Sequence, residues 1–240
     1  MKIWAHRGAS AYAPQNTLEA FRLAVEMGAD GVELDVHLSA DGEAVVCHNE
    51  TIDATSDGSG EICQMTLEQL KRYDFGAKFP GFAGKGVTLP TLREVYELLT
   101  PTGLWVDCEL KTNVYEYPGI EQKCLDIARE TGMAGRVMYS SFHFPSLARL
   151  IALDPTVQTG LLYEEPIEDT LGLALRERAW AVHPYYPRVY EYDRAAFAAA
   201  GVEINPWTVD DPEEMKRQMD MGVYALITDK PDVARRVRGY

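Results

Sequence analysis

One short segment of the chain carries acidic and basic side chains at spacings that suit metal binding or proton transfer. Within residues 31–49, Glu33, Asp35 and His37 alternate with valine and leucine. Because the side chains of a β-strand point alternately to its two faces, the three polar groups share one face and the apolar groups the other. Carboxylates on the face of a buried strand need a cation or a chemical role, since buried charge is costly.

A second histidine returns toward this strand through a predicted hairpin. Asp41-Gly42 is a signal for a hairpin turn, and residues 43–48 run back beside the first arm. This geometry brings His48 toward Asp35. A half-solvated antiparallel ribbon with a polar outer face explains the same pattern without any chemistry, so the segment alone leaves both interpretations open.

A second predicted strand, residues 104–111, repeats the pattern with Asp107, Glu109 and Lys111 on one face. The three carboxylates of Glu33, Asp35 and Glu109 favour a hard divalent cation, Mg²⁺ or Ca²⁺ with Mn²⁺ as a further candidate, over zinc. The alternative is a purely structural cluster in which Lys111 neutralises the acids.

Two histidines near these carboxylates could serve as an acid and a base. A single histidine such as His6 would by default occupy a satisfied position in the core. His6 follows the first strand, however, and His48 ends the hairpin beside three acids. Two imidazoles beside such a cluster favour proton transfer.

The predicted elements place these residues in one kind of fold. Apolar, strand-like segments begin at residues 2, 31, 104, 136, 157, 180, 202 and 224. The regular stride of the last five fits compact strand–helix units, and eight such parallel strands make a (β/α)₈ or TIM barrel. Active residues of these barrels gather at the carboxyl ends of the strands, where these acids and histidines lie. A doubly wound open sheet is the alternative, although no G-x-G-x-x-G follows the first strand.

We expect residues 1–240 to form a single barrel domain with a small insertion at residues 49–90, after the hairpin of the second strand. Three helix starts have recognisable caps. Asn16 with Glu19 predicts the first helix, and the pairs Thr66-x-x-Gln69 and Thr91-x-x-Glu94 predict two later ones.

Composition excludes some classes of partner. The formal net charge is −14, so the chain offers no basic stripe for nucleic acid, and we expect a small-molecule substrate instead. No apolar run reaches the length of about 18 residues that a membrane span needs, and the first residues do not resemble a secretion signal. We therefore expect a cytoplasmic protein without stable membrane insertion. The sequence does not indicate an oligomeric state.

Seven short motifs, in this order, resemble those of the glycerophosphodiester phosphodiesterases of the bacterial, cytosolic type. They are His6-Arg7-Gly8, Pro14-Gln15-Asn16-Thr17, Glu33-x-Asp35-Val36, Asp41-Gly42 leading to His48, Glu109-x-Lys111, Trp207-Thr208-Val209 and Thr228-Asp229-x-Pro231. Each motif alone is weak evidence. The ordered set is specific, and it extends from residue 4 to residue 231.

The resemblance implies a (β/α)₈ barrel that binds one divalent cation and hydrolyses glycerophosphodiesters to sn-glycerol 3-phosphate and an alcohol. Roles follow by matching position: Glu33, Asp35 and Glu109 would hold the cation, His6 and His48 would be the acid–base pair, and Arg7 and Lys111 would contact phosphate. Phe142 and Trp207 would line the glycerol pocket, although core packing explains either ring equally well. The nucleophile would be the glycerol 2-hydroxyl or a water.

Three positions depart from the family pattern. Gln15 replaces a glutamate, Asn49 replaces an aspartate after the second histidine, and Ala54 stands in place of an arginine. The changes at Gln15 and Asn49 motivate one alternative, a catalytically impaired barrel that binds phosphodiesters without turnover. A second alternative is a lysophospholipase D-like phosphodiesterase, which is less favoured because no basic amphipathic stretch for membrane docking is evident.

Overall fold

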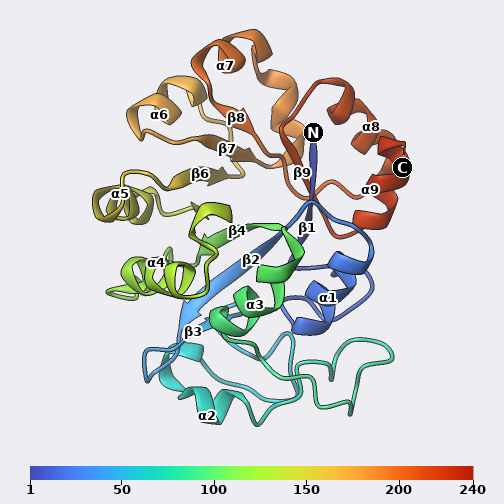
Figure 1. Ribbon diagram of the computed structural model, residues 1–240, viewed down its shortest axis with the longest axis vertical. Coiled ribbons are helices and arrows are strands. Elements are labelled where there is room, and N and C mark those ends of the chain that lie inside the picture. The colour runs from blue at the N-terminus through green and yellow to red at the C-terminus, as the bar shows by residue number, and fades with distance from the viewer. Residues whose placement is uncertain (240) are drawn as a thin grey trace.

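Eight parallel strands form a nearly closed ring at the centre of the protein, which a computed structural model describes over residues 1–239 (Figure 1). These strands are β1 (Lys2–His6), β2 (Gly31–Leu38), β4 (Trp105–Leu110), β5 (Val137–Ser141), β6 (Gln158–Tyr163), β7 (Ala181–Pro184), β8 (Glu203–Ile204) and β9 (Ala225–Thr228). All eight begin within one residue of the positions that the sequence pattern predicts.

Backbone hydrogen bonds at and beside the two edge strands bring the ring close to closure. The hydrogen-bonded strand order is β8-β7-β6-β5-β4-β2-β1-β9. Between the two ends of this order, Tyr224 N donates to Ile204 O and Ile227 N donates to Pro206 O, each at 3.0 Å. The (β/α)₈ prediction is therefore confirmed, and the open doubly wound sheet is excluded.

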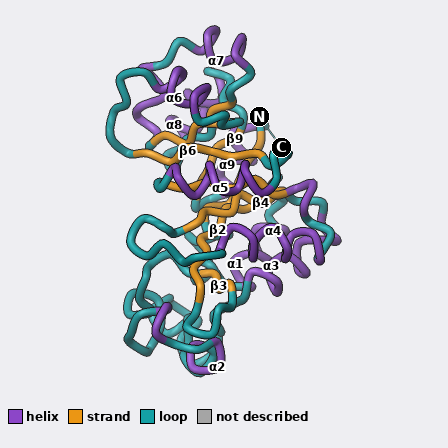
Figure 2. Tube along the Cα trace, turned by 90° about the vertical axis from the view of Figure 1, so that its left-hand side faces the viewer, coloured by secondary structure: helices purple, strands orange, loops and turns teal. Residues whose placement is uncertain are grey.

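Helices surround the ring and cover its outer face (Figures 1 and 2). The α-helices beside the strands are α1 (Leu18–Glu26), α3 (Leu92–Leu99), α4 (Ile120–Glu130), α5 (Phe144–Leu153), α6 (Thr170–Arg176), α7 (Arg194–Ala200), α8 (Pro212–Asp220) and α9 (Pro231–Arg238). Short 3₁₀ turns are η2 (Thr100–Thr102), η3 (Ala134–Arg136) and η4 (Tyr186–Glu191). No helix within residues 1–239 is both long and apolar enough to cross a bilayer.

The hairpin forms as predicted outside the ring. β3 (Ala44–Val46) pairs antiparallel with the end of β2, and Gly42 takes a positive φ of 79° in the turn. The following loops carry η1 (Ile62–Gln64) and α2 (Leu67–Leu70), and they pack around a small apolar core of their own that includes Ile52, Ile62 and Leu70. The division into one domain with an insertion at residues 49–90 stays a prediction.

Two of the three predicted helix starts are confirmed, and the third is wrong by one residue. Thr66 and Thr91 each form a reciprocal capping box with the residue three positions on. At α1, however, the N-cap is Thr17, whose hydroxyl accepts from Ala20 N at 3.3 Å. Asn16 takes a positive φ of 57° instead, and this backbone turn directs its amide toward a buried carboxylate.

Successive side chains of β2 point alternately to the apolar core outside the ring and to the interior of the barrel. Val32, Leu34 and Val36 are fully buried against the helices in the main apolar cluster. The intervening Glu33 and Asp35 therefore project into the ring, as the sequence pattern predicts.

Candidate active site

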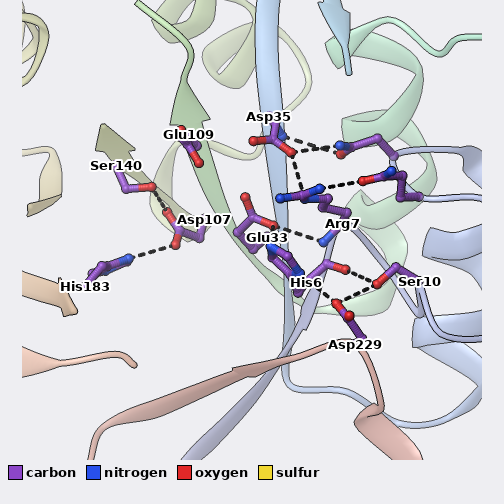
Figure 3. A network of polar contacts seen from close by, with 12 residues as sticks. His6, Arg7, Ser10, Glu33, Asp35, Asp107, Glu109, Ser140, His183 and Asp229 are labelled. Atoms are coloured by element: carbon purple, nitrogen blue, oxygen red, sulfur yellow. Dashed lines mark hydrogen bonds and ion pairs between the residues drawn. The ribbon is translucent and has the colours of Figure 1, made fainter. Parts of the chain in front are cut away.

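Three carboxylates from two neighbouring strands meet inside the barrel (Figure 3). Glu33 and Asp35 lie on β2, and Glu109 lies on β4 directly opposite Asp35 in the strand register. One oxygen from each of the three lies within 4.8 Å of the others, and all three side chains are buried. This group could hold a metal ion.

The surroundings only partly accommodate the charge of these acids. Burial, reinforced by Asp35, raises the pKa of Glu33 well above its ordinary value. Burial likewise raises the pKa of Glu109 to about 8, although Lys111 opposes the shift. Burial alone would also raise the pKa of Asp35, but Arg7 and Lys111 outweigh it and hold that pKa below its ordinary value. The cluster is therefore short of positive charge.

The donor set fits a hard divalent cation. Three ionised carboxylates carry a charge of −3, and Arg7 with Lys111 returns +2, so one negative charge is left uncompensated. Asp35 Oδ1 is buried and accepts no hydrogen bond from residues 1–239, with Lys111 Nζ at 3.6 Å. Lys111 Nζ also lies 2.9 Å from Glu109 Oε1. The ion pairs of the purely structural alternative thus exist, yet they do not neutralise the cluster.

A tight turn after β1 aims both the backbone and the side chain of Arg7 at the acids. Arg7 takes a positive φ of 56°, and its N–H donates to Glu33 Oε2 at 2.9 Å. Its Nε lies 3.4 Å from Asp35 Oδ2, and its Nη1 donates to Gln15 Oε1 at 2.6 Å. Gln15, one of the departures from the family pattern, therefore orients this guanidinium.

His6 is held by a carboxylate from the far end of the chain. Its Nδ1 lies 2.6 Å from Asp229 Oδ1, which also accepts from the Ser10 hydroxyl at 2.8 Å (Figure 3). Burial would raise the pKa of Asp229, but the hydrogen bond and charge of His6 lower it. The other ring nitrogen, Nε2, lies 3.9 Å from Glu33 Oε2 and so faces the acid cluster.

His48 has a neutral partner where His6 has a charged one. Its Nδ1 lies 2.7 Å from Asn49 Oδ1. Burial lowers the pKa of His48, although Asp35 opposes the shift. His37, by contrast, is fully buried between Tyr117 and the backbone oxygen of His48, which is a structural position.

A cavity of about 310 Å³ opens above the cluster, and we call it the main cavity. Seven of the nine predicted site residues border it: His6, Arg7, Glu33, His48, Glu109, Phe142 and Trp207. Asp35 and Lys111 are buried beside it. The rings of Phe142 and Trp207 meet edge to face with centroids 5.7 Å apart, and Phe142 is 36% exposed.

Several groups that support the site received no role from the sequence. Asn16 Nδ2 donates to Asp35 Oδ2 at 2.8 Å, a contact hidden behind the helix-cap pattern. Asp229 belongs to the motif Thr228-Asp229-x-Pro231 and follows the last strand. This position at a strand end was the only sign in the sequence that Asp229 could reach His6. Asp107 lies deeper in the barrel, where it accepts from Ser140 at 2.7 Å and pairs with the buried His183 at 3.1 Å.

Comparison with known proteins agrees with this geometry. Residues 6–233 match the Glycerophosphoryl diester phosphodiesterase family. A glycerophosphodiester phosphodiesterase of Caldanaerobacter subterraneus subsp. tengcongensis is 41% identical over 230 residues, which cover 96% of this chain and 94% of that protein.

Solved structures share the fold over almost the whole chain. An Oleispira antarctica phosphodiesterase in complex with the product sn-glycerol-3-phosphate superposes with a TM-score of 0.85 at 26% identity, covering 100% of this chain and 97% of that one. A glycerophosphodiester phosphodiesterase of Agrobacterium tumefaciens superposes with a TM-score of 0.84 at 30% identity, covering 98% and 99%. The resemblance in the motifs is thereby confirmed, and this chain belongs to the glycerophosphoryl diester phosphodiesterase family.

Proposed function

We propose that this protein hydrolyses glycerophosphodiesters to sn-glycerol 3-phosphate and an alcohol, with the help of one divalent cation. The observation that carries the proposal is the cluster of three carboxylates within 4.8 Å, with His6 and His48 bordering the same cavity. The product bound to the Oleispira antarctica relative supports the substrate class.

Glu33, Asp35 and Glu109 would hold the cation, and their hard oxygen donors favour Mg²⁺ or Ca²⁺, with Mn²⁺ as a third candidate. A bound cation supplies positive charge that polarises a phosphoryl oxygen. With Arg7 and Lys111 the site then carries a net charge of +1, which matches the single negative charge of a phosphodiester. Both cationic side chains would contact the phosphate, and Arg7 is the one that borders the main cavity.

The two histidines have environments suited to opposite tasks. His48, whose pKa burial lowers, would accept the proton of the attacking hydroxyl. His6, whose Nδ1 is held by the Asp229 carboxylate, would donate a proton from Nε2 to the departing alcohol. The phosphorus–oxygen bond to that alcohol breaks as the new bond to the attacking oxygen forms. The attacking oxygen belongs to the glycerol 2-hydroxyl or to water. In the first route a cyclic phosphate forms, and a water then breaks the bond between phosphorus and the 2-oxygen to give sn-glycerol 3-phosphate.

Phe142 and Trp207 would hold the glycerol arm of the substrate. Their edge-to-face rings border the main cavity, and Trp207 Nε1 donates to the His183 backbone oxygen at 2.8 Å, which fixes the indole. Aromatic faces of this kind pack against the C–H groups of a small polyol.

A coupled assay for glycerol 3-phosphate tests the proposal. We expect product from glycerophosphodiesters in Mg²⁺, Ca²⁺ or Mn²⁺ and none in EDTA, with less turnover of a lysophospholipid. Tight binding of glycerol 3-phosphate without product release from any diester would instead identify a non-catalytic barrel. Hydrolysis in ¹⁸O-labelled water, with early products trapped, separates the cyclic-phosphate route from direct attack by water.

A further inference from the structure

A second cavity lies behind His6 and Arg7, and we call it the side cavity. It measures about 280 Å³ and is bordered by His6, Arg7, Ser10, Gln15, Phe79 and Asp229. Its border shares only His6 and Arg7 with the main cavity, so these two residues separate the two spaces. Figure 3 shows Ser10 and Asp229 on the side of His6 that faces away from Asp107.

The two cavities match the two arms of a phosphodiester. The glycerol phosphate arm belongs in the main cavity under the proposed function, beside Phe142 and Trp207. In an in-line displacement the leaving oxygen departs opposite the attacking one, so when the glycerol 2-hydroxyl attacks, the second arm points away from the first. His6, the proposed acid, borders both spaces and can therefore reach an oxygen that departs into the side cavity.

The insertion completes the side cavity. Phe79 comes from the glycine-rich residues 76–86 of this segment, whereas the other bordering residues come from the end of β1 and from the loops after β1 and β9. The Phe79 ring meets Phe82 edge to face with centroids 5.6 Å apart, which supports its position. A smaller space of about 100 Å³, bordered by Gln15, Phe79 and Lys78 among others, adjoins it.

The chemistry of these walls suits hydroxyl groups better than an ammonium group. Ser10, Gln15 and Asp229 offer hydroxyl, amide and carboxylate groups, and the Phe79 ring offers an apolar face. Arg7 borders the side cavity and Lys78 borders the smaller space beside it, and both oppose a further positive charge. The Asp229 carboxylate already accepts from Ser10 and holds His6. Gln15 stands where the family pattern has a glutamate, so one further attraction for a cation is missing.

We propose that the side cavity is the binding site for the leaving alcohol and that it selects a neutral polyhydroxylated alcohol over a cationic aminoalcohol. The inference rests on the proposed function. It assigns Phe79 and Gln15 to substrate selection: the ring packs against the carbon skeleton of the polyol, and the amide of Gln15 donates to one of its hydroxyls.

Substrates that share the glycerol phosphate arm test this assignment. Glycerophosphoglycerol and glycerophosphoinositol carry neutral polyols, and glycerophosphocholine and glycerophosphoethanolamine carry ammonium groups. We expect kcat/KM of the wild-type protein to favour the neutral pair by about fivefold or more, the value of one hydrogen bond. Phe79→Ala should lower kcat/KM for the neutral pair about fivefold more than for the cationic pair. Phe79→Tyr, which keeps an aromatic ring, should restore the wild-type ratio of kcat/KM between the two pairs.

Gln15→Glu should move the preference toward the cationic pair, because it adds a negative charge to the side cavity. Tyr73→Phe is the matched control, since Tyr73 is an aromatic residue of the same insertion that packs on its small core and borders neither space, and it should leave the substrate ratio unchanged. Equal losses for all four substrates in Phe79→Ala, or a wild-type preference for choline, would overturn the inference. Failure of every diester to release glycerol 3-phosphate would instead overturn the proposed function.

Discussion

Cation binding at neutral pH should release a proton from the acid cluster. Burial raises the pKa of Glu109 to about 8 in the metal-free protein, so at pH 7 about nine in ten copies of this carboxyl carry a proton. A carboxylate must lose that proton to bind a metal ion. The apparent affinity for the cation should therefore fall about fivefold between pH 8 and pH 7, and about ninefold more between pH 7 and pH 6.

The same shift determines how the metal-free protein responds to pH. The ordinary pKa of Glu109 is 4.5, and the folded value is higher. Between these two values the folded protein holds a proton that the unfolded chain has already released. Stability of the metal-free protein should thus be greatest below the lower value and decline as pH rises toward 8. A bound cation should remove this decline, because it stabilises the ionised form.

Isothermal titration calorimetry in two buffers with different ionisation heats measures the proton release directly. We expect about one proton per cation at pH 7, with a further contribution from Glu33, whose pKa burial also raises. Glu164→Gln is the matched control, since Glu164 borders the main cavity outside the cluster. An affinity that does not change between pH 6 and pH 8, without proton release, would refute the reasoning.

Three further predictions concern the histidines. His6→Ala or His48→Ala should lower kcat at least about a hundredfold, whereas His143→Ala, outside the cavity, should change it less than about twofold. Asp229→Asn should lower kcat about tenfold or more, because a neutral amide replaces the charged partner of His6; an unchanged kcat would show that the charge has no role. Asn49→Asp should raise the pKa of His48. Since His48 must be neutral to act as the base, the enzyme would then need a higher pH to reach full activity. The acidic limb of the rate–pH profile should then move up by about one unit, and a stationary limb would contradict the base assignment.

The fold could be predicted from the sequence because its signals are local. Each strand of the ring is a short apolar segment, and the alternation along β2 and β4 alone decides which side chains face inward. The contact between Asp35 and Glu109 then follows from the pairing of neighbouring strands. The inward direction of the three carboxylates, and the contact between the two strands that carry them, could therefore be predicted from side-chain alternation and strand order.

The error at Asn16 has a different cause. Asn16 and Thr17 are both good N-cap residues, so local propensity cannot choose between them. The choice depends on Asp35, which lies 19 residues away and takes the Asn16 amide as a hydrogen-bond donor. A buried carboxylate gains more from this donor than a helix terminus does, because an unsatisfied buried charge is the costlier of the two.

The contact between His6 and Asp229 ties the chemistry to the closure of the barrel. The two residues are 223 positions apart, and they meet only because β9 pairs with β1. The bond at His6 Nδ1 leaves Nε2 directed at the acid cluster, so the orientation of the proposed acid depends on the last strand joining the first. Opening of the ring beside β9 would therefore release His6 while the three carboxylates of β2 and β4 kept their positions, and activity should be lost before the cation site is.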